Sequence, residues 1–146
     1  MLPERKTLPH EIPSWVESGA EYFITICTEP KGTNQLCREN AAKLICESLK
    51  FRQDRGELWV HLLLLMPDHL HAIMSFPPQV DMQKSITDWK RYTCIAGGIN
   101  WQRDFFEHRL RKNESYLEKA QYIRMNQVRA GLVDSPDKWP FVWSNR

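Results

Sequence analysis

Two histidines separated by one residue are the first candidates for chemistry in this sequence. His69 and His71 begin an apolar segment, and because side chains alternate along a β-strand, both imidazoles should project from one face while Leu70 enters the other. Two imidazoles on one face can bind a metal ion, but hydrogen-bonded structural histidines give the same pattern. The pair alone leaves both roles open.

A tyrosine and an asparagine near the C-terminus form a second candidate group. Tyr122 and Asn126 are four residues apart, so they share one face of a predicted helix. This face avoids the apolar residues Ala120 and Ile123. If the helix lies against a sheet, the Asn126 carboxamide oxygen can complete a His-His-Asn metal site beside the Tyr122 hydroxyl. The spacing is equally compatible with a packing tyrosine and a surface amide.

Hydrophobic patterns predict the elements that must position these residues. Apolar or β-branched runs predict strands, and apolar residues at three- and four-residue steps predict helices. The predicted strands span residues 22–28, 58–66, 70–76 and 101–110, and the predicted helices span residues 35–52, 81–95 and 114–130. This order, β-α-β-β-α-β-α, predicts an α+β, ferredoxin-like (split βαβ) antiparallel sheet with helices on one face and an added C-terminal helix that carries the tyrosine. The tail, residues 136–146, is predicted to fold back over the core.

Length and composition predict one compact domain over residues 1–146. The chain has 42% hydrophobic and 26% charged residues, and no segment is low in complexity. Its first 13 residues are charged and contain proline, and no apolar run approaches the length that spans a membrane. The four cysteines form no CxxC pair, which favours free thiols. We therefore expect a cytoplasmic protein without a membrane segment.

The charge of the chain permits a polyanionic partner without requiring one, because the formal net charge is only +2. If the partner is a nucleic acid, basic residues in the second half are the candidates to contact its phosphates, with Tyr92 or Trp101 stacking on exposed bases. For any single cation, a solvated surface is the alternative. The candidates are Lys84, Lys90, Arg91, Arg109, Arg111, Lys112, Arg124 and Arg129.

Three segments together resemble one protein family. They are residues 66–71 (MPDHLH), 105–111 (FFEHRLR) and 122–133 (YIRMNQVRAGLV). They resemble the matching segments of the REP-associated tyrosine transposases, in the IS200/IS605-like branch of the HUH endonucleases. The likeness runs from about Tyr22 to Ser144, in the same order and at similar spacing. The family commonly has a proline where this chain has Gln127, a change that removes a helix kink or stop.

The resemblance implies a role for each candidate. His69 and His71 would bind a metal, Mg²⁺ or Mn²⁺, with Asn126 as the third ligand, and Tyr122 would be the nucleophile. The implied partner is single-stranded DNA in a hairpin or palindromic repeat, and a homodimer is allowed without being required. Attack by the tyrosine would give a 5′-phosphotyrosine and a free 3′-hydroxyl, and reversal would join strands. The chain ends soon after the last motif, so we expect any longer C-terminal DNA-binding extension to be missing.

Two other functions stay open beside this metal-dependent endonuclease and strand transferase. A non-catalytic, RRM-like nucleic-acid-binding module would share the fold and the basic residues but would form no covalent adduct. A metallohydrolase that uses His69 and His71 with a water nucleophile would still cleave DNA after Tyr122→Phe. Structural roles are expected for His61 and for His108, with support of the bound DNA or of the metal ligands as the alternative.

Overall fold

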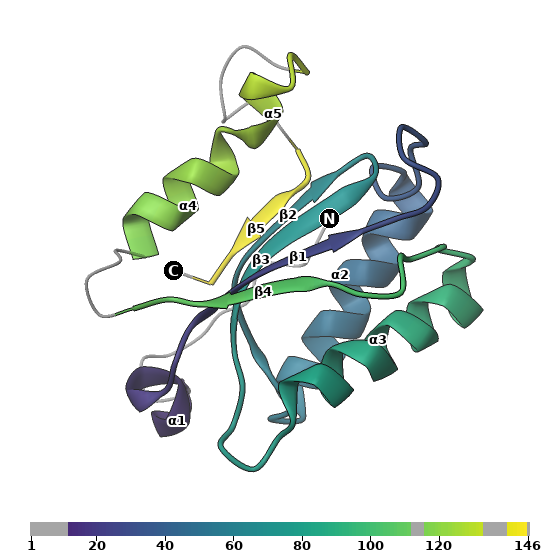
Figure 1. Ribbon diagram of the computed structural model, residues 1–146. Helices are drawn as coiled ribbons and strands as arrows, with labels where there is room; N and C mark the ends of the chain where they lie inside the picture. Colours follow the sequence, from purple (N-terminus) through teal and green to yellow (C-terminus); the bar gives the residue numbers. More distant parts are fainter. Residues whose placement is uncertain (1–11, 112–115, 133–139, 146) are drawn as a thin grey trace.

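The computed structural model describes residues 12–111, 116–132 and 140–145. These residues form one five-stranded antiparallel sheet with helices packed on it (Figure 1). The strand order is β4-β1-β3-β2-β5. The strands are β1 (Tyr22–Cys27), β2 (Trp59–Met66), β3 (His69–Ser75), β4 (Phe106–Arg109) and β5 (Val142–Ser144). The helices are α1 (Ser14–Ser18), α2 (Glu39–Asp54), α3 (Met82–Gly97), α4 (Tyr116–Arg124) and α5 (Asn126–Arg129). The predicted ferredoxin-like arrangement is confirmed.

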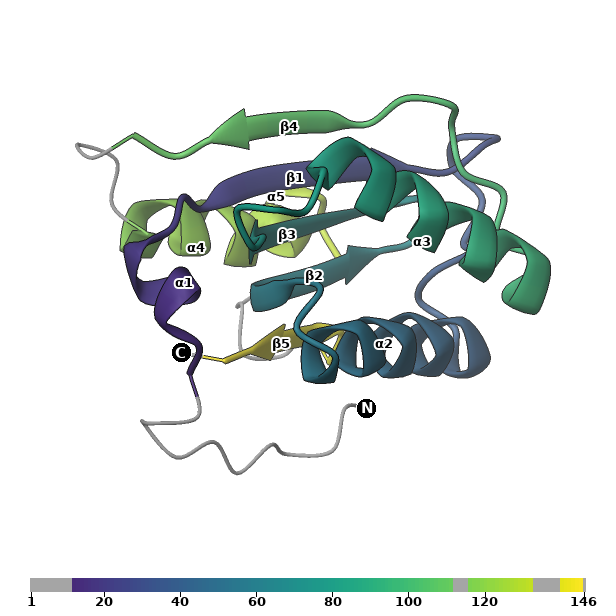
Figure 2. The same ribbon diagram turned by 90° about the horizontal axis from the view of Figure 1, so that it is seen from below.

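The sheet is covered on both faces. Helices α2 and α3 lie on one face, and α4 with α5 lies on the other (Figure 2). Neighbouring residues of β1 therefore enter different layers: Ile24 packs on the α2 and α3 side, and Phe23 on the α4 side. All residues of β2 are buried, and this explains why that segment is almost continuously apolar rather than alternating.

The strand predicted over residues 101–110 is shorter in the structure. Only Phe106–Arg109 pairs with β1, and Trp101 makes an isolated bridge with Thr28. The intervening loop is held by a side chain from α3, because the Lys90 Nζ donates hydrogen bonds to the carbonyls of residues 102 and 103 at 2.7 and 2.9 Å. These carbonyls bind an ammonium group rather than a neighbouring strand.

The helix predicted over residues 114–130 is divided at Met125 into α4 and α5. Its predicted first two residues lie outside the described part of the chain. The backbone at Met125 keeps a right-handed helical conformation with ψ near −5°, so the division is a local loosening and no sharp turn. Gly131, with a φ of 76°, follows the second segment, as the sequence predicted for the end of this helix.

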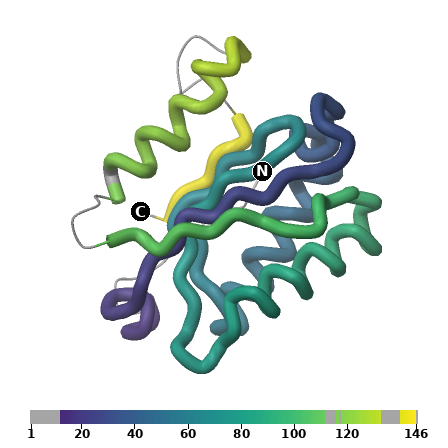
Figure 3. Tube along the Cα trace, viewed as in Figure 1, coloured from purple at the N-terminus to yellow at the C-terminus, as the bar shows by residue number. Residues whose placement is uncertain are grey.

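The C-terminal tail supplies a fifth strand that the sequence did not predict. Strand β5 returns to lie beside β2 (Figure 3), with Leu63 opposite Trp143. Side chains hold its end: the Asn145 Nδ2 donates to the Val60 carbonyl at 2.7 Å and to the Gln53 Oε1 at 3.1 Å. The same Gln53 oxygen accepts the Val60 backbone N–H at 2.9 Å, so that α2, β2 and β5 meet at one amide.

Two further expectations concern cysteines and membranes. All four cysteines are free, as predicted. Burial raises the pKa of Cys37 and of Cys46 to about 12, so both remain protonated thiols. Within the described residues, none of the helices has the length and apolar character needed to cross a membrane.

The attachment of α4 to the sheet can be tested with a matched pair of isoleucines. Ile123 is fully buried between α4 and the sheet, whereas Ile95 on α3 is 80% exposed. We expect Ile123→Ala to lower the free energy of unfolding by about 2–5 kcal/mol, because it leaves a cavity. Ile95→Ala should change it by less than about 0.5 kcal/mol. Urea unfolding measures both, and equal effects would contradict this account of how α4 is held.

Candidate active site

The two histidines of the HLH motif lie side by side at the start of β3. His69 and His71 project from the same face of the sheet, as their alternation predicted, with ring centroids 4.9 Å apart and ring planes at 76°. His71 is buried, at 8% exposure, and His69 is partly exposed. The structure thus brings the pair together with one ring near the surface and one in the interior.

Each histidine makes a hydrogen bond through its Nδ1. The His69 Nδ1 lies 2.9 Å from the Asp68 Oδ1, and the His71 Nδ1 lies 2.9 Å from the Thr25 Oγ1. A neutral imidazole carries a single N–H, so donation through Nδ1 leaves a lone pair on Nε2. In both rings Nε2 is then the nitrogen that can bind a cation. In metal sites, a hydrogen bond from the other ring nitrogen orients the histidine ligand in the same way.

Asp68 is itself held in place by the segment after β1. Its Oδ2 accepts the Gly32 backbone N–H at 2.9 Å, and its carbonyl accepts the Thr28 N–H and hydroxyl at 2.9 and 3.0 Å. The hydrogen bond from His69 and that from Gly32 lower the pKa of the Asp68 carboxyl. Asp68 is therefore a fixed anionic acceptor. The sequence interpretation gave it no role, although its place directly before His69 was a usable signal.

Asn126 joins the last helical segment to the histidine pair. Its Nδ2 lies 3.3 Å from the His71 Nε2, across 55 residues of sequence. This contact is consistent with the tautomer above, because an unprotonated Nε2 can accept a hydrogen bond. A half-turn of the amide exchanges its nitrogen and oxygen and would present Oδ1, a metal-ligating atom, at the same place. The structure therefore brings His69, His71 and Asn126 together.

Tyr122 stands at the surface next to this group. Its side chain is 51% exposed, and its ring meets Phe23 edge-on with centroids 6.4 Å apart. Phe23 in turn stacks on His71, with centroids 5.4 Å apart and planes at 24°. One aromatic ring thus separates the tyrosine from the buried histidine.

Two cations border the tyrosine. The Arg129 guanidinium lies 4.5 Å from the centroid of the Tyr122 ring, and its Nη2 donates to the Tyr122 carbonyl at 2.6 Å. The Lys119 Nζ lies 5.4 Å from the centroid of Phe23 and 6.0 Å from that of Tyr122. An anion that approaches the phenol therefore meets positive charge from α4 and α5.

The buried histidine is neutral at physiological pH. Burial, together with smaller effects of the positive charges of His69 and Arg129, lowers the pKa of His71 to about 4. A neutral imidazole is the form that binds metals.

Comparison with known proteins agrees with the sequence motifs. No family model matches the chain. A REP-associated tyrosine transposase of Escherichia coli (strain K12) is 29% identical over 133 residues, which cover 88% of this chain and 78% of that protein. A putative REP-associated tyrosine transposase of Haemophilus influenzae is 25% identical over 145 residues, covering 84% and 78%. The resemblance to the REP-associated tyrosine transposases is confirmed.

Solved structures share the fold. A REP-associated tyrosine transposase bound to a REP hairpin matches with a TM-score of 0.75 at 23% identity, over 85% of this chain and 76% of that chain. A putative transposase from Deinococcus radiodurans matches with a TM-score of 0.53 at 18% identity, over 90% and 98%. The fold of this chain is therefore similar to the fold of these two solved structures.

The basic residues predicted to bind DNA are divided between the two faces of the sheet. Arg129 lies at the tyrosine, whereas Lys84, Lys90 and Arg91 belong to α3 on the opposite face. Lys90 is only 8% exposed and its ammonium binds two loop carbonyls, so this structural contact replaces the predicted contact with phosphate. The Lys84 Nζ is 2.7 Å from the Asp88 carboxylate.

The remaining predicted contacts take varied positions. Arg109 lines a cavity of about 470 Å³ with Trp15 and Tyr22, on the α3 side of the sheet. Arg111 is exposed and Arg124 is partly buried at the end of α4, while residue 112 lies outside the described part of the chain.

Two aromatic or imidazole side chains have structural roles. Trp101, predicted to stack on bases, packs on Trp89 with centroids 5.4 Å apart and donates its indole N–H to the Thr93 hydroxyl. His61 is buried and its Nε2 lies 2.8 Å from the Ser75 Oγ, in keeping with the structural role expected for it.

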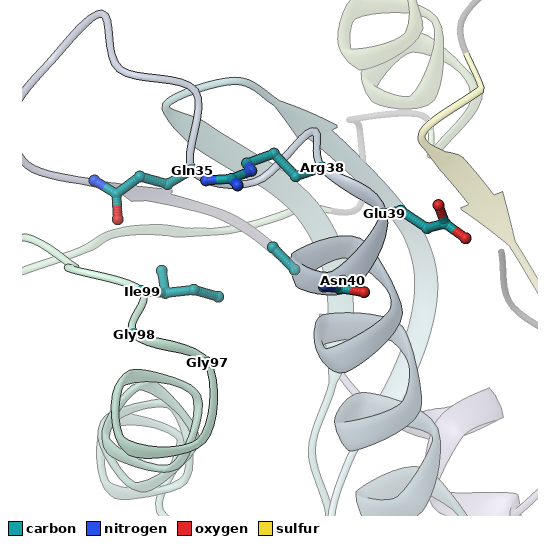
Figure 4. A pocket seen from close by; sticks show the side chains of 8 residues that line it. Gln35, Arg38, Glu39, Asn40, Gly97, Gly98 and Ile99 are labelled. Carbon is teal, nitrogen blue, oxygen red and sulfur yellow. The ribbon is translucent and has the colours of Figure 1, made fainter.

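A separate hollow of about 410 Å³ lies between the start of α2 and the end of α3 (Figure 4). Gln35 and Arg38 line one side, and Gly97, Gly98 and Ile99 line the other. The Gln35 amide donates to the Glu29 carbonyl and accepts the residue 100 N–H, each at 2.8 Å. Its polar atoms thus tie loops together, and none of the predicted site residues lines this hollow.

Burial of neutral His71 should make the metal-free protein less stable in mild acid. Its pKa falls from 6.5 to about 4 on folding, so the unfolded state binds more protons between these values. The contribution of neutral His71 to the free energy of unfolding should be fully present above about pH 6.5. It should be lost as the pH falls towards 4, by up to roughly 3 kcal/mol.

Urea unfolding with a chelator at pH 7 and pH 5 measures this loss. In His71→Gln the difference between the two pH values should shrink, because the variant has no imidazole to protonate. An unchanged difference would show that other groups cause the acid lability.

Proposed function

We propose that this chain is a metal-dependent endonuclease and strand transferase that acts on single-stranded DNA through Tyr122. The observation that carries the proposal is the contact of Asn126 on α5 with His71 on β3. Because Tyr122 stands one helical turn before Asn126, this contact ties the helix that bears the phenol to the histidine pair. The nucleophile and the candidate ligands then belong to one region of the structure, with Tyr122 exposed and His71 buried.

The donor set fits a divalent cation. Among the described residues, no group of three or more His, Cys, Asp or Glu side chains could hold a metal ion, so the third protein ligand in this proposal is the Asn126 amide oxygen. The Asp68 and Thr25 hydrogen bonds support ligation through both Nε2 atoms. Two imidazoles and an amide oxygen suit Mn²⁺, Mg²⁺ or Zn²⁺, and we propose Mg²⁺ or Mn²⁺, the ions that the family resemblance implies. When bound, the cation would supply Lewis-acid polarisation of a phosphate oxygen.

The proposed chemistry uses the phenol of Tyr122. The phenol oxygen attacks the phosphorus of a DNA phosphodiester and forms a new O–P bond. The bond between that phosphorus and the 3′ oxygen of the preceding nucleotide breaks. The phenolic proton passes to solvent, and the departing 3′ oxygen takes up a proton. A 5′-phosphotyrosine and a 3′-hydroxyl result, and attack by a 3′-hydroxyl reverses the step without ATP. Arg129 and Lys119 support the approach of the anionic phosphate.

The relatives support the choice of substrate. Two of them are named REP-associated tyrosine transposases, and the solved relative is bound to a REP hairpin. We therefore propose hairpin-forming repeat DNA as the substrate and a transposase-like role for this chain. A non-catalytic binding module would leave the grouping of His69, His71, Asn126 and Tyr122 without a purpose.

The nucleophile can be tested with two tyrosines of similar exposure. Tyr122 is 51% exposed at the site, and Tyr92 is 47% exposed on α3, at the other face. With labelled hairpin single-stranded DNA and Mn²⁺, a denaturing gel should show a protein-linked product for the wild type and for Tyr92→Phe. Tyr122→Phe should abolish it, because the attacking oxygen is gone.

Two results would contradict the proposal. Cleavage that survives Tyr122→Phe would indicate a water nucleophile, and a wild type that binds DNA without forming an adduct would indicate a binding module.

The role of Asp68 predicts a change in metal affinity that does not depend on activity. Asp68→Ala removes the acceptor that orients His69, so Mn²⁺ affinity should fall by about 10- to 100-fold. The fold should persist, because the backbone bonds of residue 68 to Thr28 are retained. Asp88→Ala, which removes a carboxylate paired with Lys84 on α3, is the control. Titration calorimetry measures the Mn²⁺ affinity of the wild type and of both variants. Equal affinities of Asp68→Ala and the wild type would refute the role of Asp68.

A further inference from the structure

Phe106 is an exposed aromatic ring on the same side of the sheet as the histidines. It begins β4, an edge strand, and its side chain is 57% exposed. In the register of the sheet it stands opposite Thr25, which stands opposite His71. Residues directly opposite one another project from the same face, so the three side chains form a row across β4, β1 and β3.

Ring contacts connect Phe106 to the site. Its ring lies 6.3 Å from that of Phe23, with planes at 71°. Phe23 is buried, and it also contacts His71 and Tyr122. One intervening ring therefore separates Phe106 from the candidate nucleophile and from a candidate metal ligand. The core does not account for Phe106, because most of the ring faces solvent.

The surroundings of Phe106 suit one class of ligand. Unpaired nucleobases stack on aromatic side chains while adjacent cations contact the phosphates. The cations are present on α4 and α5, where Lys119 and Arg129 border the neighbouring rings of Phe23 and Tyr122. A base inside a duplex already stacks on its neighbours, so a single surface ring discriminates in favour of unpaired nucleotides.

We propose that Phe106 is a stacking platform for an unpaired nucleobase that flanks the phosphate attacked by Tyr122. The inference rests on the proposed function, which identifies the ligand as single-stranded DNA. It adds a binding subsite to that function. The subsite recognises the flat face of a base. It therefore accepts each of the four bases and rejects fully paired DNA.

The chain contains a matched control for this ring. Phe51 on α2 is 59% exposed, almost the same as Phe106, but it lies on the opposite face of the sheet. It also has a cation nearby, with the Arg55 guanidinium 5.5 Å from its centroid. The exposure of the two rings is thus alike and cations lie in the vicinity of both, whereas their positions relative to Tyr122 differ.

The test measures binding without catalysis. A chelator is present, and the DNA is a hairpin with an unpaired flank in which 2-aminopurine replaces one base at a time. Phe106→Ala should weaken binding about ten-fold and remove the fluorescence quenching at one flank position. Phe106→Tyr should restore both, since it keeps the ring, and Phe51→Ala should match the wild type. A fully paired oligonucleotide should bind wild type and Phe106→Ala equally.

Three results would overturn the subsite. The first is that Phe106→Ala and the wild type bind the flanked hairpin with equal affinity. The second is that Phe51→Ala loses as much affinity as Phe106→Ala. The third is that Phe106→Ala changes the oligomeric state without changing the fluorescence quenching. The last would assign the ring to a protein contact. Failure of the proposed function is separate: without an adduct in Mn²⁺, quenching that depends on Phe106 would still establish the base subsite.

Discussion

Packing of α4 against the second face of the sheet is the constraint on which the site depends. Ile123 and Ala120 are buried against Phe23 and Ile73. Burial of one isoleucine side chain contributes about 1.5–3 kcal/mol, whereas a hydrogen bond such as that between Asn126 and His71 contributes about 1 kcal/mol. Apolar burial therefore places the helix, and the polar contact orients an amide within a position already fixed.

The turn between β2 and β3 serves two purposes at once. Asp68 reverses the chain, and its carboxylate accepts from the His69 ring and from Gly32. The backbone carbonyl of Asp68 is also held by Thr28, so the turn itself is fixed to the end of β1, and rotation of the carboxylate would break its hydrogen bond with Gly32. His71 is oriented differently, by the Thr25 hydroxyl and by stacking on Phe23. The partly exposed His69 ring is thus held by a hydrogen bond to a carboxylate, and the His71 ring is held mainly by burial.

Local patterns predicted much of this structure, and long-range contacts determined the rest. The buried strands around His69 and His71 follow from apolar runs in the sequence, and the shared helix face of Tyr122 and Asn126 follows from their four-residue spacing. The limits of the 101–110 segment do not, because Lys90 from α3 binds its carbonyls. A three-residue strand such as β5 carries almost no periodic signal.

Side-chain roles at the site were harder to predict for the same reason. Phe106 reads as an ordinary strand residue until the register places it opposite Thr25 on an edge strand. Lys90 and Trp101 read as surface groups, but both are used to hold the loop before β4. Spacing identifies which residues share a face, and only the assembled sheet shows which faces meet.

The division of the last helix at Met125 places the candidate nucleophile and the candidate ligand in two consecutive helical segments. Tyr122 belongs to a segment anchored by apolar contacts, while Asn126 belongs to a four-residue segment held by buried Gln127 and by the polar contacts of Asn126 and Arg129. The Arg129 guanidinium crosses this division to the carbonyl and ring of Tyr122, so a shift of the amide towards a bound cation would also be felt by the segment that bears the phenol.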